Sequence, residues 1–427
     1  MMNSIENEEF IPILLGSDMN VYGMARSFNE AYGKICQAYA SDQLAPTRYS
    51  KIVNVEVIPG FDKDPVFIET MLRLAKERYS DKSKKYLLIA CGDGYAELIS
   101  QHKQELSEYF ICPYIDYSLF ERLINKVSFY EVCEEYDLPY PKTLIVREEM
   151  LVNGHLEQEL PFEFPVALKP ANSVEYLSVQ FEGRKKAFIL ETREEFDLIL
   201  GRIYEAGYKS EMIVQDFIPG DDSNMRVLNA YVDEDHQVRM MCLGHPLLED
   251  PTPASIGNYV VIMPDYNEKI YQTIKAFLEK IEYTGFANFD MKYDPRDGEY
   301  KLFEINLRQG RSSFFVTLNG LNLARFVTED RVFNKPFVET TYGTNQSDKA
   351  RLWMGVPKKI FLEYARENED KKLAEQMIKE NRYGTTVFYE KDRSIKRWLL
   401  MKYMFHNYIP RFKKYFHVKD QSQTVRR

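Results

Sequence analysis

Two short segments of this chain place oxygen ligands at spacings that suit a metal ion. Glu304 and Asn306 stand two residues apart in an expected strand, so their side chains share one face. Asp290 lies in a second expected strand over residues 286–292, and turn-forming residues 294–298 separate the two strands. A hairpin would bring the two carboxylates and the amide together, and such oxygen ligands suit a hard cation such as Mg²⁺.

Two arginines, Arg308 and Arg311, follow these ligands directly. Cationic groups beside a Mg²⁺ site suit a bound polyphosphate, with Arg308 on a transferring phosphoryl group and Arg311 holding a substrate carboxylate. An acidic strand edge with two solvated or salt-bridged arginines would have the same pattern. The spacing by itself leaves both interpretations open.

The order of these residues carries a resemblance to a known family. Asp290 followed by Glu304-x-Asn306-x-Arg308 resembles the metal-binding end of ATP-grasp ligases, and residues 304–313 are similar to a run in the carbamoyl phosphate synthetase large subunit. Most of residues 10–420 resemble the D-aspartate ligases of Gram-positive cell-wall synthesis. The resemblance implies an ATP-dependent enzyme in which Asp290, Glu304 and Asn306 hold Mg²⁺.

Two lysines are candidates for binding phosphate. Lys126 lies in an expected helix over residues 119–136, and Lys169 ends an expected strand over residues 164–169. By type each would be a solvated surface lysine, although the elements between them would also allow both to converge on phosphates. The resemblance implies that Lys126 and Lys169 hold the phosphates of ATP.

An expected strand over residues 213–218 closes at a Pro-Gly turn. Without the resemblance, the segment could equally be a turn with solvated acids. Gln215 stands where relatives often have an acid, and Asn288 stands where many have an arginine. The resemblance implies adenine contacts from Asp216, Phe217 and Ile218, and a hydrogen bond from the ribose hydroxyls to Asp222.

Composition narrows the class of protein. The composition, 44% hydrophobic and 28% charged, indicates a folded soluble protein, and 427 residues are enough for two or three domains or one elaborate multi-lobed enzyme. Five scattered cysteines without a C-x-x-C motif indicate reduced, mostly buried thiols, and six histidines without an H-x-x-x-H pair argue against zinc. Neither a G-x-G-x-x-G motif nor a P-loop is present, which argues against nicotinamide binding and a P-loop ATP site.

Charge is distributed unevenly along the chain. Residues 391–427 hold eleven Lys and Arg against two Asp, a net charge of +9. Because the whole chain has a net charge of −9, the other residues have a net charge of −18. Basic, aromatic and aliphatic residues together favour contact with a membrane surface, whereas the alternative is a helix docked on the acidic body. The N-terminus has no signal peptide pattern and no apolar run approaches 18 residues. We expect a cytoplasmic protein that the tail could bring to the inner face of the membrane.

The elements that must position these residues predict an α/β fold. Residues 11–15 and 86–91 are short apolar strands that each lead through a turn toward a helix, as in doubly wound domains. Residues 172–187 are a candidate mobile hairpin or lid. Residues 245–259 are expected to form a loop, which is a candidate acceptor pocket. Helices are expected over residues 268–282, 319–330 and 359–381.

The expected organisation has three parts. Residues 1–115 form a Rossmann-like domain that precedes the ATP-grasp domain. Residues 116–345 form an ATP-grasp domain, with a lid subdomain over about 140–220 and a metal-binding subdomain over about 221–345. Residues 346–427 form a helical extension with the basic tail.

The resemblance implies a reaction. The β-carboxyl of D-aspartate would be activated by ATP as an acyl phosphate, and the lysine ε-amine of a UDP-linked muramyl peptide precursor would displace the phosphate. No nucleic acid partner is expected. Two alternatives stay open: another ATP-grasp amide ligase acting on a different amino acid or small carboxylate, and a non-catalytic nucleotide-binding regulator at the membrane.

Overall fold

The structure is a computed structural model, which describes residues 9–255, 257–346 and 349–424. The chain divides into two compact units. Unit 1 comprises Met1–Phe120, Asp221–Asp290 and Ile305–Arg427, and unit 2 comprises Glu121–Gly220 and Met291–Glu304. The chain thus leaves unit 1 twice and returns to it twice, and the three domains expected from the sequence stay a prediction.

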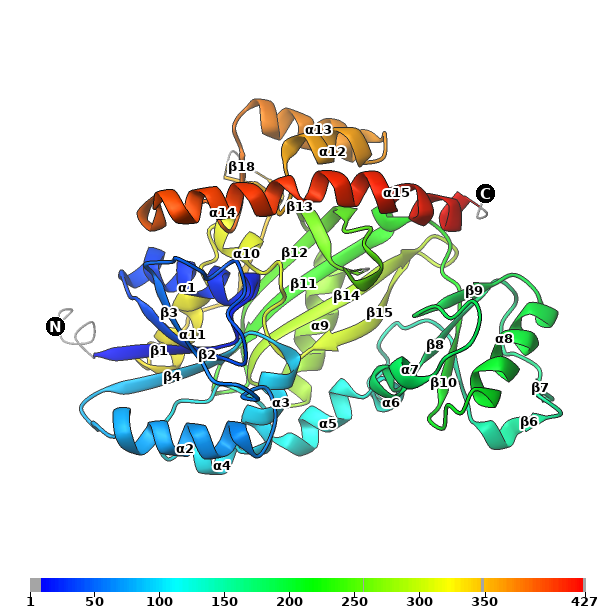
Figure 1. Ribbon diagram of the computed structural model, residues 1–427, viewed down its shortest axis with the longest axis horizontal. Coiled ribbons are helices and arrows are strands. Elements are labelled where there is room, and N and C mark those ends of the chain that lie inside the picture. The colour runs from blue at the N-terminus through cyan, green and yellow to red at the C-terminus, as the bar shows by residue number, and fades with distance from the viewer. Residues whose placement is uncertain (1–8, 256, 347–348, 425–427) are drawn as a thin grey trace. The chain divides into compact units, whose positions relative to one another are not determined.

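Unit 1 contains a parallel sheet near the N-terminus, built from β1 (Phe10–Leu15), β2 (Cys36–Ala40), β3 (Val53–Val57) and β4 (Lys85–Ala90). Its helices are α1 (Met19–Tyr32), α2 (Val66–Arg78), α3 (Asp93–Gln101) and α4 (Lys103–Leu106). The strand order is β3-β2-β1-β4, with α1 and α2 on opposite faces (Figure 1). This arrangement confirms the doubly wound fold expected from the two strand–turn–helix segments.

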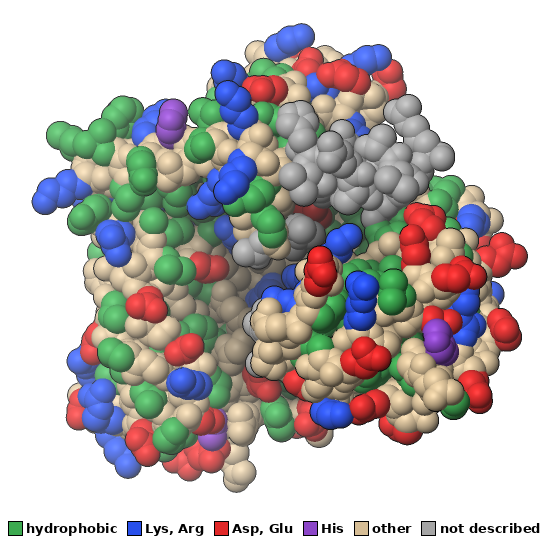
Figure 2. All heavy atoms as spheres, turned by 45° about the vertical axis from the view of Figure 1, so that its right-hand side comes forward, with side chains coloured by type: hydrophobic (Ala, Val, Ile, Leu, Met, Phe, Trp, Pro, Cys, Tyr) green, Lys and Arg blue, Asp and Glu red, His purple; other side chains and the backbone are tan. Residues whose placement is uncertain are grey.

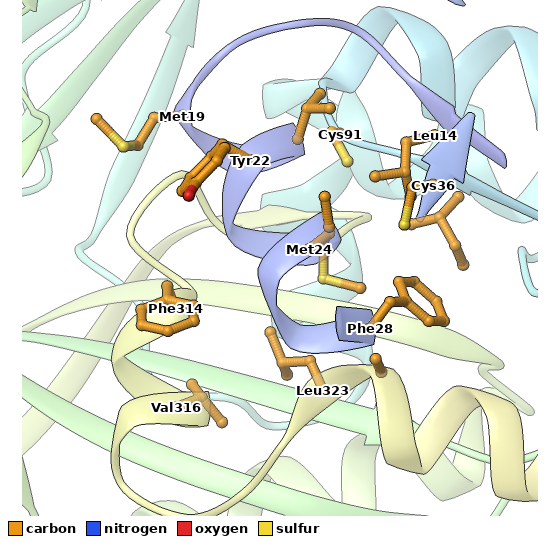
Figure 3. Packing of buried hydrophobic residues seen from close by; sticks show 14 of the residues in the cluster. Leu14, Met19, Tyr22, Met24, Phe28, Cys36, Cys91, Phe314, Val316 and Leu323 are labelled. Atoms are coloured by element: carbon orange, nitrogen blue, oxygen red, sulfur yellow. The ribbon is translucent and has the colours of Figure 1, made fainter. Parts of the chain in front are cut away.

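Helix α1 is the packing centre of unit 1. Asp18 begins the helix by accepting hydrogen bonds from the N–H groups of Asn20 and Val21, and Gly33 ends it with a left-handed φ of 66°. Helix α1 shares its hydrophobic core with the parallel sheet on one side and with a later segment of the chain on the other (Figure 3). Figure 3 shows this contact through Leu14, Met19, Tyr22, Met24, Phe28, Cys36, Cys91, Phe314, Val316 and Leu323.

A second, larger sheet consists of β11 (Met225–Val232), β12 (Val238–Glu249), β13 (Tyr259–Asp265), β14 (Gly285–Asp294), β15 (Glu299–Asn306), β16 (Thr341–Tyr342), β17 (Leu352–Met354) and β18 (Tyr383–Gly384). The order is β15-β14-β11-β12-β13-β17-β18, and β16 pairs with β12. The neighbouring positions of β14 and β15 confirm the predicted hairpin. The associated helices are α9 (Glu268–Lys280), α10 (Phe314–Leu318) and α11 (Leu323–Arg331), of which α9 and α11 match the predictions.

The start of β14 shows why a glycine is needed there. Gly285 has a φ of 93°, and a Cβ at this position would lie 2.1 Å from the carbonyl oxygen of Pro113. The close approach holds β14 against the segment that follows the parallel sheet.

Unit 2 has an antiparallel sheet of order β5-β10-β8-β9. Its strands are β5 (Thr143–Val146), β8 (Val166–Pro170), β9 (Phe188–Leu190) and β10 (Met212–Asp216), with a small hairpin of β6 (Leu151–Val152) and β7 (His155–Leu156). Helix α8 (Arg193–Glu205) lies beside this sheet (Figure 1). It buries Phe196, Leu200 and Ile203 in the core of this unit.

Two single helices expected from the sequence are each two helices in the structure. Residues 119–136 contain α5 (Tyr117–Ile124) and α6 (Lys126–Glu135), because the extended backbone and side-chain oxygen of Asn125 cap α6 at Val127 and Ser128. Residues 359–381 contain α12 (Lys358–Tyr364) and α13 (Glu369–Lys379), where Asn368 caps α13 in the same way. Local capping therefore overrides continuous helical periodicity at both asparagines.

Two segments that were not expected to contain helix or long strands do contain regular secondary structure. The segment 172–187, predicted to be a mobile hairpin or lid, contains a helix, α7 (Ser173–Ser178), so the hairpin is wrong there and the lid role stays a prediction. The predicted loop over residues 245–259 begins as the end of β12 and ends in β13, which leaves residues 250–258 as the connection. In residues 245–259, pairing with a neighbouring strand determines the backbone conformation, and this pairing cannot be predicted from the local sequence.

The C-terminal part of the described chain consists of α14 (Ile395–His406) and α15 (Tyr408–Thr424). Both contribute buried side chains to the cores of unit 1. In the part of the chain that the structure describes, no helix combines the length and the apolar character needed to cross a bilayer. All five cysteines are buried and free, as expected.

Candidate functional site

Unit 2 gathers cationic side chains around one carboxylate. Lys126 is the first residue of α6 and Lys169 lies near the end of β8. Burial lowers the pKa of Lys126, the charges of Lys169 and Lys186 lower it further, and the charge of Glu304 raises it. The predicted phosphate-binding lysines therefore lie in one electrostatic environment, together with Lys186, which sequence reasoning did not identify.

Within the described part of the chain, the ammonium group of Lys169 is held without a direct carboxylate contact. Its Nζ donates to the hydroxyl of Tyr130 at 3.0 Å, and it lies 5.5 Å from the Tyr130 ring centroid and 6.0 Å from that of Phe303. Burial lowers the pKa of Lys169 to about 8, and the charge of Glu304 opposes this shift. A phosphate would add negative charge beside two lysines that have only Glu304 as an acidic neighbour among the groups that shift their pKa values.

Tyr130 is a site residue that sequence reasoning missed. Its hydroxyl donates to the carbonyl oxygen of Phe303 at 3.0 Å and lies 3.5 Å from Oε1 of Gln215, whose Nε2 donates to Thr143 at 2.8 Å. Gln215 thus helps to orient Tyr130. The available signal was the spacing, because Tyr130 stands one helical turn after Lys126 on α6.

The predicted adenine segment is held by a lysine and an arginine from the strand hairpin. Arg296 forms two hydrogen bonds with the carboxylate of Asp216, at 2.9 and 2.8 Å. Lys292 donates to the carbonyl oxygen of Ile218 at 2.8 Å and lies 5.2 Å from the ring centroid of Phe217. Sequence reasoning identified the segment but neither Lys292 nor Arg296.

These contacts limit what the segment offers to adenine. The Asp216 carboxylate is committed to Arg296, which leaves the backbone and the Phe217 ring as the groups for the predicted contact. The backbone of Asp222 starts a short 3₁₀ turn in unit 1. Its side chain, which we predicted to bind ribose, lies outside the described residues. The adenine and ribose roles stay predictions.

The predicted metal ligands lie on both strands of the hairpin. Asp290 of β14 and Asn306 of β15 belong to unit 1, and the exposed Glu304 of β15 belongs to unit 2. The Asn306 amide donates to Oδ1 of Asn288 at 3.2 Å, and its oxygen accepts from Arg308 at 3.3 Å. Asn288, which replaces the arginine of many relatives, therefore orients a predicted ligand.

The donor set fits Mg²⁺ by its chemistry, because it consists of two carboxylates and an amide oxygen. Among the described residues, no group of three or more His, Cys, Asp or Glu side chains is arranged to hold a metal. The predicted set has only two such side chains, so this finding does not bear on it. The joint ligation by Asp290, Glu304 and Asn306 stays a prediction.

Arg308 is anchored by the N-terminus of α3 in unit 1. Its Nη2 lies 2.8 Å from Oδ2 of Asp93, the first residue of α3. Its Nε and the Oδ1 of Asp93 are buried without a hydrogen-bond partner in the described structure. Sequence reasoning missed Asp93, although its Gly-Asp-Gly context marks the turn that begins α3.

The loop after Arg308 is locked by buried amides. Gln309 donates to the carbonyl oxygen of Ala90 at 3.0 Å, and Asn20 donates to the carbonyl oxygen of Gln309 at 3.0 Å. The N–H of Gly310 donates to Asn229, and a Cβ on Gly310 would lie only 3.0 Å from Oδ1 of Asn288. Among the described residues, Oδ1 of Asn20, Nδ2 of Asn229 and Oε1 of Gln309 are buried and unpaired. Buried polar atoms of this kind are normally paired, so a ligand or water at this loop would complete them.

Arg311 is exposed and interacts electrostatically with two elements that are distant in sequence. Burial raises the pKa of Asp18, and the charges of Arg311 and Arg308 lower it. Burial likewise raises the pKa of Tyr408 in α15, where Arg311 lowers it and Asp250 raises it. Asp18 and Tyr408 therefore lie in the electrostatic environment of Arg311, and sequence reasoning identified neither.

With this geometry, comparison with known proteins defines the class: the chain has the ATP-grasp fold. It is similar to the ADP complex of an N5-carboxyaminoimidazole ribonucleotide synthetase, with a TM-score of 0.55, 14% identity, and coverage of 78% of this chain and 79% of that one. For an L-amino acid ligase from Bacillus licheniformis, the TM-score is 0.52 at 12% identity, with coverage of 76% and 74%.

A biotin carboxylase domain from Hydrogenobacter thermophilus, solved with MgADP, ADP and bicarbonate, gives a TM-score of 0.54 at 12% identity, with coverage of 77% and 71%. At the sequence level, the chain is 21% identical over 312 residues to the carbamoyl phosphate synthase large chain of Clostridium acetobutylicum. The match covers 70% of this chain but only 28% of that protein. No family model matches the chain.

The lowered pKa of Lys169 predicts a pH dependence of nucleotide binding. As pH rises through about 8, Lys169 of the free protein loses its charge, so affinity for ATP should fall by up to about tenfold per pH unit. Calorimetric titration with ATP across this range measures the effect. In Lys169→Arg the guanidinium stays charged, so the decline should disappear. An unaltered protein whose affinity stays constant well above pH 8 would contradict the phosphate role.

Proposed function

We propose that this protein is an ATP-dependent carboxylate–amine ligase. The observation that carries the proposal is that Lys126 and Lys169 both interact with Glu304 in unit 2, with Lys186 near Lys126, which suits a bound polyphosphate. The ATP-grasp fold supports it, since an ADP complex and an MgADP complex are among the similar structures.

The proposed reaction proceeds in two displacements. A substrate carboxylate oxygen attacks the γ-phosphorus of ATP, the bond to the β–γ bridging oxygen breaks, and ADP leaves. An amine nitrogen then attacks the acyl carbon, phosphate leaves, and the proton lost by the amine passes to solvent. Lys126 and Lys169 orient the ATP phosphates, and Arg308 stabilises charge on the transferred group. Bound Mg²⁺, held by Asp290, Glu304 and Asn306, would neutralise phosphate charge.

For the substrates we propose D-aspartate, activated at its β-carboxyl, and the lysine ε-amine of a UDP-linked muramyl peptide. The resemblance of the sequence to D-aspartate ligases motivates this choice. Arg311 would bind the free α-carboxylate through two parallel hydrogen bonds, and Asp18 would bind the ammonium group. Their mutual electrostatic interaction in unit 1 supports a site that receives a zwitterion.

Phosphate release provides the direct test. The protein is incubated with ATP, Mg²⁺ and the lysine-containing precursor, and D-aspartate is compared with L-aspartate and a panel of other amino acids and small carboxylates. We expect release that requires both D-aspartate and the precursor. Release with another carboxylate would favour a different ATP-grasp amide ligase, which the similarity to an L-amino acid ligase makes the second candidate. Absence of release with every carboxylate and amine would favour a nucleotide-binding regulator.

Arg311→Lys should separate substrate binding from ATP binding. A lysine keeps the charge but cannot form two parallel hydrogen bonds, so KM for the amino acid should rise about 10–150-fold while KM for ATP changes little. Arg308→Lys should instead lower kcat. Arg325→Lys on α11, whose charge is solvated, is the matched control. A change confined to the ATP constants in Arg311→Lys would assign the carboxylate role to another residue.

A further inference from the structure

Helix α14 has apolar residues on two faces, and unit 1 covers only one of them. The inner face buries Met401 and Phe405 in the core around α1, and Arg397 is buried beside them. Tyr408 and Phe412 continue the buried line into α15, against α12 and α13. The alternative from the sequence, in which the basic segment docks on the body through an apolar face, therefore accounts for the inner face of α14 and not for its outer face.

A buried ion pair fixes which face points outward. The fully buried carboxylate of Asp392 accepts hydrogen bonds from Tyr22, from Ser50 and from the backbone of Lys51, and pairs with Nε of Arg397 at 2.9 Å. The guanidinium of Arg397 also lies 4.0 Å from the Tyr22 ring centroid. These contacts hold the start of α14 against α1 and the segment that leads into β3, so the rotation of the helix about its axis is set.

The outer face carries a stripe of large apolar side chains. Ile395, Trp398, Leu399 and Tyr403 are 81%, 41%, 55% and 64% exposed. They stand at spacings of three, four and eight residues from the first, which is one side of a helix. Figure 2 shows hydrophobic side chains interspersed with Lys and Arg in this part of the surface. Exposed apolar residues grouped in this way mark a contact surface.

Basic residues outnumber acidic ones around the stripe, where Glu390 is an exposed acid. From residue 393 to residue 416 the sequence contains no Asp or Glu, and Asp392 is buried. Lys402 lies 5.7 Å from the Trp398 ring centroid and 5.3 Å from that of Phe388, so cation and aromatic groups alternate. The exposed basic side chains are those of Lys391, Arg393, Lys396, Lys402, Arg411, Lys413 and Lys414.

A cavity of about 290 Å³ opens beside the stripe. Phe388, Tyr389 and Trp398 supply aromatic walls, and Arg393 and Arg397 supply guanidinium groups. Asp392 also lines the cavity but is paired with Arg397. Among the described residues that line the cavity, Glu390 is the one further acid. Aromatic walls with a cation at the edge suit the headgroup region of an anionic lipid.

We propose that the outer face of α14 docks the protein on an anionic lipid bilayer. Ile395, Trp398, Leu399 and Tyr403 would enter the interface between headgroups and acyl chains, and the surrounding lysines and arginines would contact lipid phosphates. A second copy of the chain fits this face less well. A twofold interface would bring the basic residues around the stripe of one copy against those of the other, and their like charges would repel.

The test is co-sedimentation of the full chain with vesicles. Phosphatidylcholine vesicles that contain phosphatidylglycerol are compared with vesicles of phosphatidylcholine alone. We expect binding to the anionic vesicles that weakens as salt is added, since salt screens the lysine–phosphate attraction. Lys396→Gln with Lys402→Gln should lower the partition coefficient about 30-fold. The matched control is Lys63→Gln with Lys82→Gln, two exposed lysines of the N-terminal part, which should bind as the unaltered protein does.

The apolar contribution is tested separately. Ile395→Glu with Leu399→Glu should abolish vesicle binding, and Val338→Glu is the control because Val338 is 97% exposed elsewhere in the chain. Equal binding to neutral vesicles, or unchanged binding of the lysine variant, would overturn the proposal. The remaining outcome is that a second copy of the chain covers this face, and sedimentation velocity without lipid tests it. If the unaltered protein self-associates and the α14 variants do not, the face binds a second copy and the membrane proposal is overturned. Phosphate release by these variants is measured in parallel and should be unchanged, which separates this proposal from the proposed reaction.

Discussion

Replacing Glu304 with glutamine is expected to lower kcat/KM for ATP-dependent ligation by at least about 100-fold. Mutating a residue that hydrogen-bonds to a metal ligand typically lowers metal affinity or activity about 10–100-fold. Loss of a direct carboxylate ligand should lower activity by at least as much. Glutamine keeps the shape of the side chain but removes the charge that attracts the cation. Glu304 also faces the lysine cluster, so its loss should further alter the electrostatic environment of Lys126 and Lys169.

The measurement is steady-state phosphate release at increasing Mg²⁺, with circular dichroism to establish that the variant folds. Glu299→Gln is the matched control, since it makes the same change at the other end of β15. The control should retain the activity of the unaltered protein. Near-normal turnover of Glu304→Gln at saturating Mg²⁺ would remove Glu304 from the metal site.

Asp392→Ala should destabilise unit 1 by about 3–5 kcal/mol, the range for breaking a buried ion pair by removing one partner. The variant leaves the Arg397 guanidinium buried without its carboxylate, and it removes the acceptor for Tyr22, Ser50 and the Lys51 backbone. Unfilled space adds to this electrostatic cost. The effect should be large because residue 392 connects the C-terminal segment to α1.

Urea unfolding monitored by fluorescence measures this change. Glu77→Ala is the control, since its pair with Arg73 on α2 is about half exposed and such i,i+4 pairs contribute about 0.3–0.5 kcal/mol. Replacing both Asp392 and Arg397 with apolar residues should cost less than the sum of the single changes, because no buried charge is then left unpaired. A midpoint for Asp392→Ala equal to that of the control would contradict this account.

The strand hairpin was predictable because its determinants are local. Two segments with a period of two flank a turn of Asp, Pro and Gly residues, and the structure has β14 and β15 at those positions. The same holds for α9, whose apolar positions recur with helical spacing and whose N-terminus is capped by Asn267. Such elements form wherever pattern, turn chemistry and capping agree.

Periodicity failed where a cap competed with it. Residues 119–136 have helical spacing throughout, yet Asn125 interrupts the helix because its side chain satisfies the N–H groups of the next turn. This interruption matters for function, since it makes Lys126 the first residue of α6. The loop over residues 245–259 was misjudged for the opposite reason, because cross-strand pairing extends β12 through residue 249.

The sequence by itself determined the chemical inventory of this protein: the oxygen ligands, the two lysines, the arginine pair and the basic, aromatic C-terminal segment. Only the tertiary structure decided which groups support them. Arg308 meets Asp93 across 215 positions of sequence, and Tyr130 meets Lys169 across 39. It also decided which apolar face of α14 is covered. The physical reason is that ion pairs, hydrogen bonds and burial depend on distance in space, whereas a sequence pattern records only separation along the chain.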